Sequence, residues 1–263
     1  MGTVIQRRVI VFSIIIPNYN NAAWLDRCLT SVLKQKYKDY EIIVVDDCST
    51  DSSRDILYVY YNDKIDTIAY NSRKRWNGGT RNVGMAFTHK KYVLFIDSDD
   101  YLADDMCLTE LDKIIKANNY PDLVRLSYYY CENGQEQLVD LSNQDTPEKI
   151  THDVNVACWT KCIKRDKVVK FPENTLMEDV VQHIDQMDVI ESVAVCSKGI
   201  IKWNRDNANS TSKQKNSKWR SSLYRYYADL LDLTVTKPYC REELEKRRAN
   251  ALRNIKNDRF EQE

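Results

Sequence analysis

Carboxylates that directly follow two apolar segments are the residues best placed to do chemistry. Asp46-Asp47 ends the segment 40–45, and Asp97-Ser98-Asp99-Asp100 follows the segment 92–96. Residues 97–112 hold seven carboxylates and no Lys or Arg, so solvent or a cation must relieve their repulsion. All-oxygen ligands favour Mg²⁺ or Mn²⁺, which take one or two carboxylates and complete their shell with water and substrate phosphate. We therefore predict a divalent ion at residues 97–100, bridging the protein to a diphosphate. For Asp46-Asp47 alone, capping of a helix is an equal alternative.

The segments that must position these acids alternate apolar runs with helical periodicity. This alternation is typical of βαβ units and predicts a mainly parallel sheet flanked by helices. Strands are expected over 9–16, 40–45, 65–70 and 92–96. Helices are expected from residue 20 or 21 to 33, from 49 to 60 and, after a Gly78-Gly79 loop, through Phe87. Loops at the carboxyl ends of such strands converge on the ligand.

The second half of the chain is less regular. We expect a strand over 123–130 with a turn at 132–134, a short element over 156–163 and a helix after Met177. A last strand over 192–203 is followed by two helical segments near 219–233 and 241–255.

The composition of the 263 residues excludes several classes of protein. With 39 Lys+Arg, 39 Asp+Glu and 43% apolar residues, the chain is neither a wholly basic nucleic-acid binder nor a disordered acidic protein. No run reaches the roughly 18 apolar residues that span a bilayer. Arg7-Arg8 and the run 9–16 mimic a signal peptide, but no small-x-small cleavage site precedes Pro17, so a buried strand is preferred. The eight scattered cysteines are expected to be buried and reduced, which predicts a cytoplasmic location.

The formal net charge of zero is a cancellation between two parts of the chain. Residues 198–263 hold 16 basic and 9 acidic side chains, whereas the preceding residues hold 23 basic and 30 acidic ones. The basic part is expected either to meet a diphosphate or an anionic membrane surface, or to be a solvated basic face.

From about Val11 to Ser212, the order of motifs resembles the family 2 glycosyltransferases of the GT-A fold. The five motifs are IIIPNYN at 14–20, VVDDCSTD at 44–51, NGGTRNVG at 77–84, FIDSDD at 95–100 and MED at 177–179. Together and in this order they are specific for the superfamily, but not for the sugar that is moved. The resemblance implies a Rossmann-like GT-A domain over 1–212 and a helical extension over 213–263. Within the domain, 9–118 would bind the nucleotide and 119–212 the acceptor.

The resemblance implies roles for four residues around the donor nucleotide. Tyr19 would stack on or flank the base, because a ring suits the flat face of a base, and Pro17 would shape the pocket. Asp47 would accept the imino N–H of the base, which favours uracil. Arg81 would lie near the nucleotide or its phosphates, where a cationic fork is useful.

The same resemblance places the sugar and the metal at the Asp-Ser-Asp-Asp motif. Asp97 would hold the ribose or the sugar, with Ser98 beside it. Asp99, together with Asp97, would bind the Mn²⁺ or Mg²⁺ that bridges the diphosphate and stabilises the charge on the leaving group. Asp100 would support these residues through water or hydrogen bonds.

Transfer with inversion needs a carboxylate that takes the proton of the acceptor hydroxyl. By resemblance, Asp179 is the general base, and Glu178 binds the acceptor or supports the base. Without the other motifs, these two acids would simply complement the positive end of a helix. Trp159 resembles the family's acceptor-side position and would stack on a sugar, although a buried core Trp is an equal alternative. Arg205 and Ser210–Ser212 resemble a C-terminal stretch that closes over the diphosphate in some relatives.

The sequence therefore predicts an inverting, metal-dependent transferase that moves a sugar from a nucleotide-sugar, with UDP expected, to a hydroxyl of a glycan or lipid-linked acceptor. Two alternatives remain open. One is a non-catalytic nucleotide-sugar-binding module, against which the intact acids count. The other is a sugar nucleotidylyltransferase, but its Gly-x-Gly-Thr-Arg loop follows the first strand, whereas Gly78-Gly79-Thr80-Arg81 follows the third. Peripheral contact with a membrane is compatible with the sequence, and no nucleic-acid partner is expected.

Overall fold

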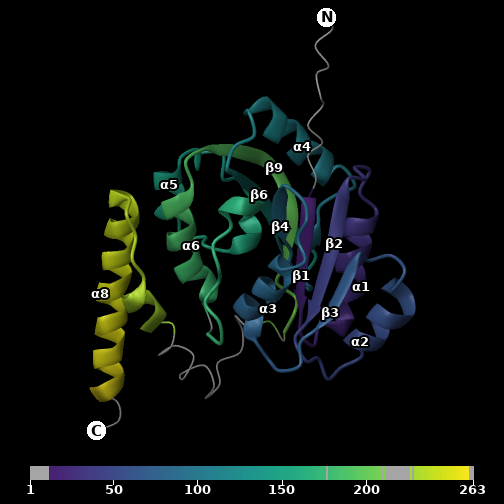
Figure 1. Cartoon of the computed structure of the whole chain (residues 1–263), viewed down its shortest axis with the longest axis horizontal. Helices are drawn as coiled ribbons and strands as arrows, with labels where there is room; N and C mark the ends of the chain where they lie inside the picture. Colours follow the sequence, from purple (N-terminus) through teal and green to yellow (C-terminus); the bar gives the residue numbers. More distant parts are fainter. Residues whose placement is uncertain (1–11, 176, 209, 211–225, 227, 261–263) are drawn as a thin grey trace, which may run out of the picture.

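One mixed sheet runs through the protein, flanked by helices (Figure 1). The computed structural model describes residues 12–175, 177–208, 210, 226 and 228–260, with side chains of the last helix described only through 253. The strands lie in the order β3-β2-β1-β4-β8-β6-β9-β5, and β7 pairs with β6. The expected α/β architecture is thereby confirmed.

The half of the sheet formed by the first four strands is parallel, as the sequence predicts. It consists of β1 (Phe12–Asn18), β2 (Tyr40–Asp46), β3 (Thr67–Tyr70) and β4 (Tyr92–Phe95). In β1, Ile14 and Ile16 face one core cluster with Leu25 and Leu108, whereas Ile15 faces a second cluster with Phe95. Burial of β1, β2 and β4 on both faces explains why their sequences are mainly apolar, whereas β3, at the edge of the sheet, is only partly buried. Parallel pairing brings the polar carboxyl ends of the four strands to one edge.

The other half of the sheet mixes directions. It is built from β5 (Tyr101–Leu102), β6 (Leu123–Glu132), β7 (Gln135–Val139), β8 (Lys161–Lys164) and β9 (Val193–Asn204). Strand β8 joins β4 and β6 by antiparallel pairing, and β6 and β9 are parallel with a bulge between Leu126 and Tyr128. The parallel arrangement thus holds for β1 to β4 and gives way to mixed pairing beyond β4.

Helices α1 (Ala22–Leu33) and α4 (Cys107–Ala117) cover the first core cluster, and α3 (Trp76–Met85) packs on β1 and β2. The short α2 (Ser53–Ile56) continues into a π-helical turn at Leu57–Tyr61. Gly78 and Gly79 lie within α3, so the expected loop at these residues is wrong. Helix α3 passes so close to its neighbours that a Cβ on Gly78 would lie 2.2 Å from the Pro172 carbonyl oxygen, which only glycine avoids.

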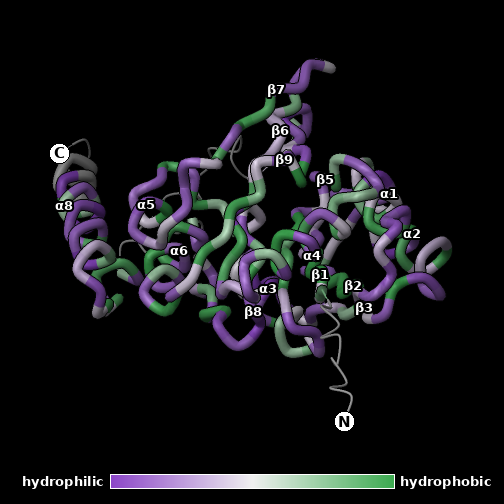
Figure 2. The backbone as a smooth tube through the Cα atoms, turned by 90° about the horizontal axis from the view of Figure 1, so that it is seen from above, coloured by the Kyte–Doolittle hydropathy of each residue, from purple (hydrophilic) through white to green (hydrophobic). Residues whose placement is uncertain are grey.

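A third core cluster joins α5 (Pro147–Thr151), α6 (Glu178–Val189) and α8 (Pro238–Phe260). Two 3₁₀ turns, Cys158–Thr160 and Arg165–Lys167, flank β8. Helix α8 lies at the end of the molecule opposite α1 and α2 (Figure 1) and is largely hydrophilic (Figure 2), which fits the predicted helical extension. The β6–β7 hairpin projects from the body (Figure 2).

The described helices include none that is long and apolar enough to cross a membrane. Several sequence expectations fall outside the described residues: the start of the first strand at 9–11, Thr211-Ser212 of the closing stretch, and the first part of the helix near 219–233. All eight cysteines are free thiols, as expected, and only Cys48 is not fully buried.

Candidate functional site

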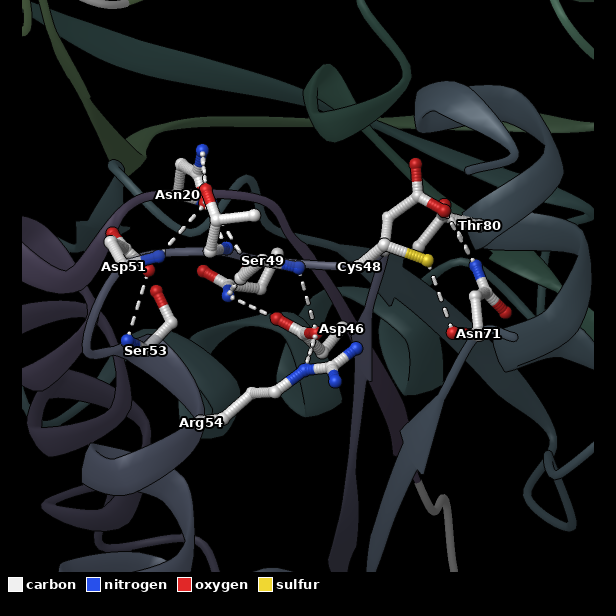
Figure 3. Close-up of polar contacts among 12 residues, drawn as sticks. Asn20, Asp46, Cys48, Ser49, Asp51, Ser53, Arg54, Asn71 and Thr80 are labelled. Carbon is white, nitrogen blue, oxygen red and sulfur yellow. Dashed lines mark hydrogen bonds and ion pairs between the residues drawn. The ribbon is translucent and has the colours of Figure 1, made fainter. Parts of the chain in front are cut away.

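The carboxyl ends of β1 and β2 are held together by a network of short polar side chains. Asp46 is fully buried and accepts hydrogen bonds from Asn18 Nδ2 (3.0 Å), the Ser49 backbone N–H (3.1 Å) and Arg54 Nε (2.7 Å). Asn20 Oδ1 accepts the backbone N–H of Thr50 at 2.7 Å (Figure 3). The hydrogen bonds of Asp46 therefore hold the two strand ends together. Asp47 is then the acid of this pair that is the candidate for binding a ligand.

Asp47 holds the loop that leads into α3. Its Oδ1 accepts Asn71 Nδ2 (2.8 Å) and the Arg75 N–H (2.7 Å), and its Oδ2 accepts the Trp76 N–H (2.9 Å). Asp47 is 3% exposed. A carboxylate offers about four acceptor positions, so these three hydrogen bonds leave one position of Asp47 unaccounted for. Both Cys48 and Trp76 have positive φ (63° and 61°), a backbone conformation that costs free energy in a residue other than glycine. The hydrogen bonds of Asp47, and the contact of the Cys48 thiol with Asn71 O, stabilise this conformation (Figure 3).

Tyr19 directly follows β1 and is 41% exposed, so part of its side chain is open to a ligand. The ammonium of Lys74 lies over this ring and 5.6 Å from the centre of the Trp76 ring. Pro17, by contrast, is buried inside β1, opposite Val45. Pro17 thus acts through the backbone that precedes Tyr19, and two aromatic rings and a cation surround the space beside Asp47.

The Asp-Ser-Asp-Asp motif follows β4, and each of its side chains has a different partner. Asp97 Oδ1 accepts Arg81 Nη2 at 2.7 Å, and Ser98 Oγ accepts Asn21 Nδ2 at 2.9 Å. Asp99 Oδ2 accepts Asn207 Nδ2 at 2.7 Å. The motif thereby contacts α3, the start of α1 and the segment after β9.

Asp100 is the buried anchor of the motif. It is 2% exposed, and its Oδ1 accepts the backbone N–H of Asn204, the last residue of β9, at 2.8 Å. Burial and the charges of Asp99 and Asp97 raise the pKa of Asp100 well above its ordinary value. Asp100 therefore fixes the motif to the sheet and is not exposed to a ligand.

The same electrostatics makes the outer part of the motif suited to a cation. Burial and the neighbouring Asp97 raise the pKa of Asp99, so the two carboxylates repel each other. A divalent ion would relieve this repulsion, and the donors are all oxygen, as Mg²⁺ and Mn²⁺ require. The described residues contain no group of three or more ligands that could hold a metal by themselves. Mg²⁺ commonly takes one or two carboxylates from a protein and keeps water and substrate phosphate in its shell, so Asp97 and Asp99 would be enough protein ligands.

Arg81 joins this motif to the acidic pair at the start of α6. Its guanidinium is 3% exposed, and its Nη1 lies 2.5 Å from Glu178 Oε1 while Nη2 bonds Asp97. Both ends of the fork are thus occupied by carboxylates, so the guanidinium positions the two acids and has no open face for a phosphate. The expected place of Arg81 near the nucleotide stays a prediction.

Glu178 is 6% exposed, and it packs against α3 through Gly78. Burial raises the pKa of Glu178 to about 7, while the Arg81 charge acts in the opposite direction and the Asp179 charge adds to the rise. Because Glu178 is closed in and paired, its geometry fits the predicted support of the base and leaves little surface for binding an acceptor.

Asp179 is the more accessible member of the pair, being only partly buried. Its pKa is raised by burial, and the charges of Arg81 and Lys161 counteract this rise. Met177, directly before the pair, adopts the left-handed conformation with φ 62°. Non-glycine residues in such a strained backbone conformation occur preferentially at functional sites. The two acids therefore lie at the start of α6, directly after a residue in an unfavourable backbone conformation.

Trp159 is 5% exposed and packs edge-on against Tyr128, with ring centres 4.9 Å apart. Trp203 lies 5.7 Å from Trp159 on the same cluster and is partly exposed. The packing of Trp159 fits the core alternative, because a ring that is almost fully covered has no face free for a sugar. The predicted stacking of Trp159 on an acceptor is therefore not retained.

Three polar residues around the site were not identified from the sequence. Asn21 and Asn207 are bonded to each other (3.1 Å) and to the Asp-Ser-Asp-Asp motif, and Lys74 covers Tyr19. Asn21 directly precedes α1 and makes no side-chain capping hydrogen bond there. Asn207 belongs to the stretch that was expected to close over the diphosphate, but isolated Asn and Lys residues carry no spacing signal of their own.

The family model of glycosyl transferase family 2 matches residues 13–170. The chain belongs to this family. The glycosyltransferase is 27% identical over 221 residues to an uncharacterized glycosyltransferase of Haemophilus influenzae, covering 81% of this chain and 87% of that one. It is also 42% identical over 101 residues to a poly(ribitol-phosphate) beta-glucosyltransferase of Bacillus spizizenii, but this match covers 36% of this chain and 16% of the relative. Most of the other relatives are likewise matched over less than half of their length.

Solved structures confirm the GT-A fold of this glycosyltransferase. The Staphylococcus aureus TarS fragment 1–349 in complex with UDP-GlcNAc superposes with a TM-score of 0.74 at 22% identity, covering 92% of this chain and 72% of that one. The mannosyltransferase PcManGT from Pyrobaculum calidifontis, in complex with GDP-Man and Mn²⁺, gives a TM-score of 0.65 at 14% identity, covering 90% and 68%. With an enzyme family established, the binding module and the nucleotidylyltransferase are set aside.

Proposed function

We propose that this glycosyltransferase moves a sugar from a UDP-sugar to a hydroxyl of a glycan or lipid-linked acceptor, with inversion. The observation that supports this proposal most is the convergence on Arg81. One buried guanidinium orients Asp97 of the donor-side motif and Glu178, the neighbour of Asp179. The arrangement keeps the ion-binding acids and the expected base at a fixed separation, as displacement at a single carbon requires.

On the donor side, Tyr19 flanks the base and Asp47 accepts its imino N–H with its remaining acceptor position. Uracil has one such N–H between two carbonyl groups, whereas guanine presents an N–H beside an amino group. A single free acceptor position therefore suits uracil better. The UDP-GlcNAc bound to TarS is consistent with this choice, and the GDP-Man bound to PcManGT is the alternative that an experiment must exclude.

Asp99 and Asp97 are the residues that would hold Mn²⁺ or Mg²⁺. When bound there, the ion would supply Lewis-acid stabilisation of the leaving diphosphate. The chain orients the two carboxylates through hydrogen bonds: Arg81 donates to Asp97, and Asn207 donates to Asp99. The Mn²⁺ bound to PcManGT supports the choice of a divalent ion, with Mn²⁺ and Mg²⁺ both open.

On the acceptor side, Asp179 takes the proton of the attacking hydroxyl. The oxygen of that hydroxyl forms the new bond to the anomeric carbon as the bond to the diphosphate breaks on the opposite face, which inverts the configuration. Glu178 remains bound to Arg81 and holds the start of α6. Because burial raises the pKa of Asp179, its carboxylate is a stronger base than an ordinary aspartate.

The organisation of the chain belongs to the same proposal. Residues 1–212 form the GT-A domain, with the nucleotide on about 9–118 and the acceptor on about 119–212, and residues 213–263 extend it. The protein acts in the cytoplasm, with peripheral contact to the inner face of the membrane where the acceptor is lipid-linked.

A donor screen tests the proposal. The thermal unfolding of the protein is recorded with UDP-, GDP- and TDP-sugars in Mn²⁺ and in EDTA, because a ligand that binds the folded state raises its stability. We expect stabilisation by UDP-sugars in Mn²⁺, and UDP release from the same compounds. Stabilisation by GDP-sugars alone would overturn the assignment of uracil, and stabilisation without UDP release would count against transfer.

A further inference from the structure

The segment that connects β8 to α6, residues 167–173, is bonded to α6 by a buried amide. Gln186 is 0% exposed; its Oε1 accepts the Val169 N–H at 3.1 Å, and its Nε2 donates to Lys167 O at 2.6 Å. Gln182, one turn earlier on the helix, donates its Nε2 to the same Oε1 at 3.1 Å and thereby orients the amide. Gln186 thus pairs with the backbone of this connecting segment through both a donor and an acceptor.

A second amide bonds the same segment to α3. Asn82 Oδ1 accepts the Phe171 N–H at 2.9 Å, and Asn82 Nδ2 donates to Phe171 O at 2.9 Å. The Phe171 ring packs edge-on against Phe95 of β4, with ring centres 5.3 Å apart, and the Arg81 guanidinium lies 5.4 Å from its centre. Asn82 therefore holds Phe171 between the end of β4 and the cation that pairs with Glu178.

The connecting segment and the start of α6 lie on one face of α3. The residues of α3 and of its N-terminal cap that meet them are spaced as i, i+3, i+4 and i+7: Arg75, Gly78, Gly79 and Asn82. A Cβ added to Gly79 would lie 3.5 Å from Glu173 Cγ. A Cβ added to Gly78 would lie 2.2 Å from Pro172 O and 2.9 Å from Glu178 Cγ. The segment and the first residue of α6 thus contact the same turn of α3.

The ion pair between Arg81 and Glu178 cannot by itself fix the direction of α6. It holds the helix at its first residue, and a helix held at one point can still pivot. Residues 178 and 186 are about 12 Å apart along the axis, at about 1.5 Å per residue. Gln186 therefore supplies a second, distant point of attachment, which Asn82 connects back to α3 through Phe171.

We propose that Asn82 and Gln186 form an amide clamp that positions Asp179 for catalysis by fixing α6 against α3 through the connecting segment. This inference rests on the proposed function, in which Asp179 is the general base. Asn82 and Gln186 are positioning residues, because their hydrogen bonds reach the connecting segment and not the reacting atoms. The clamp sets where α6 presents Asp179 relative to Arg81, and with it the reach of the base to the acceptor hydroxyl.

The first test is Asn82→Leu, which keeps the branched shape of the side chain and removes both hydrogen bonds. The kcat and KM of UDP release from UDP-GlcNAc and UDP-glucose are measured, together with UDP affinity in Mn²⁺. We expect kcat to fall by at least about 10-fold, with UDP affinity within about twofold of wild type. Donor binding is spared because Asp47 and Asp99 keep their own partners, Asn71 and Asn207. Gln186→Met should show the same division.

Gln35→Met is the matched control. Gln35 is also a fully buried amide that joins two backbone segments: its Oε1 accepts the Leu108 N–H at 3.1 Å, and its Nε2 donates to Asp104 O at 2.5 Å. These bonds tie α1 to the start of α4 and leave α6 untouched. Gln35→Met should therefore lose stability as Asn82→Leu does but keep the wild-type kcat. An equal loss of kcat in the two variants would overturn the clamp.

A double-mutant cycle with Asp179→Asn shows whether Asn82 acts through the base. If it does, Asn82→Leu slows the wild-type protein but slows Asp179→Asn little further. An equal fold loss in both backgrounds, or wild-type kcat in Asn82→Leu, would overturn the inference. Should Asn82→Leu fail to fold, Asn82→Asp takes its place, since it keeps the acceptor for the Phe171 N–H and loses the donor.

The same variants separate this inference from the proposed function. Wild-type turnover in Asp179→Asn contradicts the proposed function itself. A slow Asp179→Asn together with a wild-type kcat in both Asn82→Leu and Gln186→Met contradicts only the amide clamp.

Discussion

Arg81 and Glu178, 97 residues apart in the chain, form a buried ion pair whose Nη1 and Oε1 atoms lie 2.5 Å apart. The other end of the same guanidinium holds Asp97 at 2.7 Å. Arg81 is thus the physical link between the motif that follows β4 and the acidic pair that begins α6. Both the stability of the site and its geometry depend on this residue.

We predict that Arg81→Met destabilises the protein by about 3 to 5 kcal/mol, because it leaves Glu178 buried without its partner. Chemical unfolding by urea measures the change. In Arg81→Met/Glu178→Gln the loss should be smaller than the sum of the two single losses, since each variant removes the same contact. Arg75→Met is the control: its pair with Glu173 is about one-third exposed on each side and should cost under about 1 kcal/mol. Equal losses for Arg81→Met and Arg75→Met would refute the buried link.

Asp99→Ala should abolish the part of donor binding that depends on a divalent ion. We expect UDP to bind wild type more tightly in Mn²⁺ than in EDTA, and to bind Asp99→Ala equally weakly in both, as titration calorimetry would show. Asp105→Ala serves as the control, because Asp105 is a surface acid paired with Lys36 in the same acidic stretch. A full response to Mn²⁺ in Asp99→Ala would remove Asp99 from the metal site.

Gly78→Ala should both destabilise the protein and slow transfer. The new Cβ would lie 2.2 Å from Pro172 O and 2.9 Å from Glu178 Cγ, so α3 and α6 must separate. Overpacking of this kind costs about 1 to 3 kcal/mol, and it displaces Glu178 from Arg81. Gly134→Ala, in the β6–β7 turn, meets no atom within 4 Å but has φ 74°. That variant should lose about 1 kcal/mol through backbone strain and keep its activity; equal activities for both variants would contradict the prediction.

His183 should make the protein sensitive to acid. The folded-state pKa of His183 lies well below the ordinary 6.5, mainly because of burial. As pH falls below about 6.5, the unfolded chain binds a proton that the folded protein does not, so stability falls by up to about 1.4 kcal/mol per pH unit. His183→Gln retains an amide donor for Ile150 O and should not show this loss. Urea unfolding at pH 7.5 and 5.5 compares the two, and a stability difference that stays constant with pH would show that His183 is not held neutral.

The parallel half of the fold, β1 to β4, could be predicted from the sequence because its signals are local. Apolar runs such as 42–45 are buried on both faces, and the acids that follow them mark the carboxyl edge. The spacing of Leu25, Cys28, Leu29, Val32 and Leu33 predicts one apolar stripe on α1; the first four are buried and Leu33 is partly buried against the same core. The mixed pairing of β8 with β4 and β6 could not be predicted, since strand direction beyond βαβ units depends on long-range contacts.

The acidic residues of the candidate site could be identified from the sequence, but the side chains that form hydrogen bonds with them could not. Asp97, Asp99 and Asp179 stand in motifs, whereas the bond from Arg81 to Glu178 and the contacts of Asn207 depend on how distant segments meet. Trp159 was assigned to the acceptor by its position in a motif, but its burial against Tyr128 is a property of the packed sheet. Gly78-Gly79 was interpreted as a loop from glycine content alone. The close approach of α3 to Pro172 explains why glycine is needed inside a helix there.

The most direct test of the account is the separation of donor binding from transfer in Asp179→Asn. UDP affinity in Mn²⁺ and the rate of UDP release from a UDP-sugar are measured for wild type, Asp179→Asn and Asp185→Asn, the last being a control on the same helix. We predict that Asp179→Asn binds UDP as wild type does but releases UDP at least about 100-fold more slowly, and that Asp185→Asn matches wild type. In the wild-type reaction, the sugar first formed should have the anomeric configuration opposite to that of the donor. Wild-type turnover in Asp179→Asn, or retention of configuration, would contradict the assignment of Asp179 as the base of an inverting transfer.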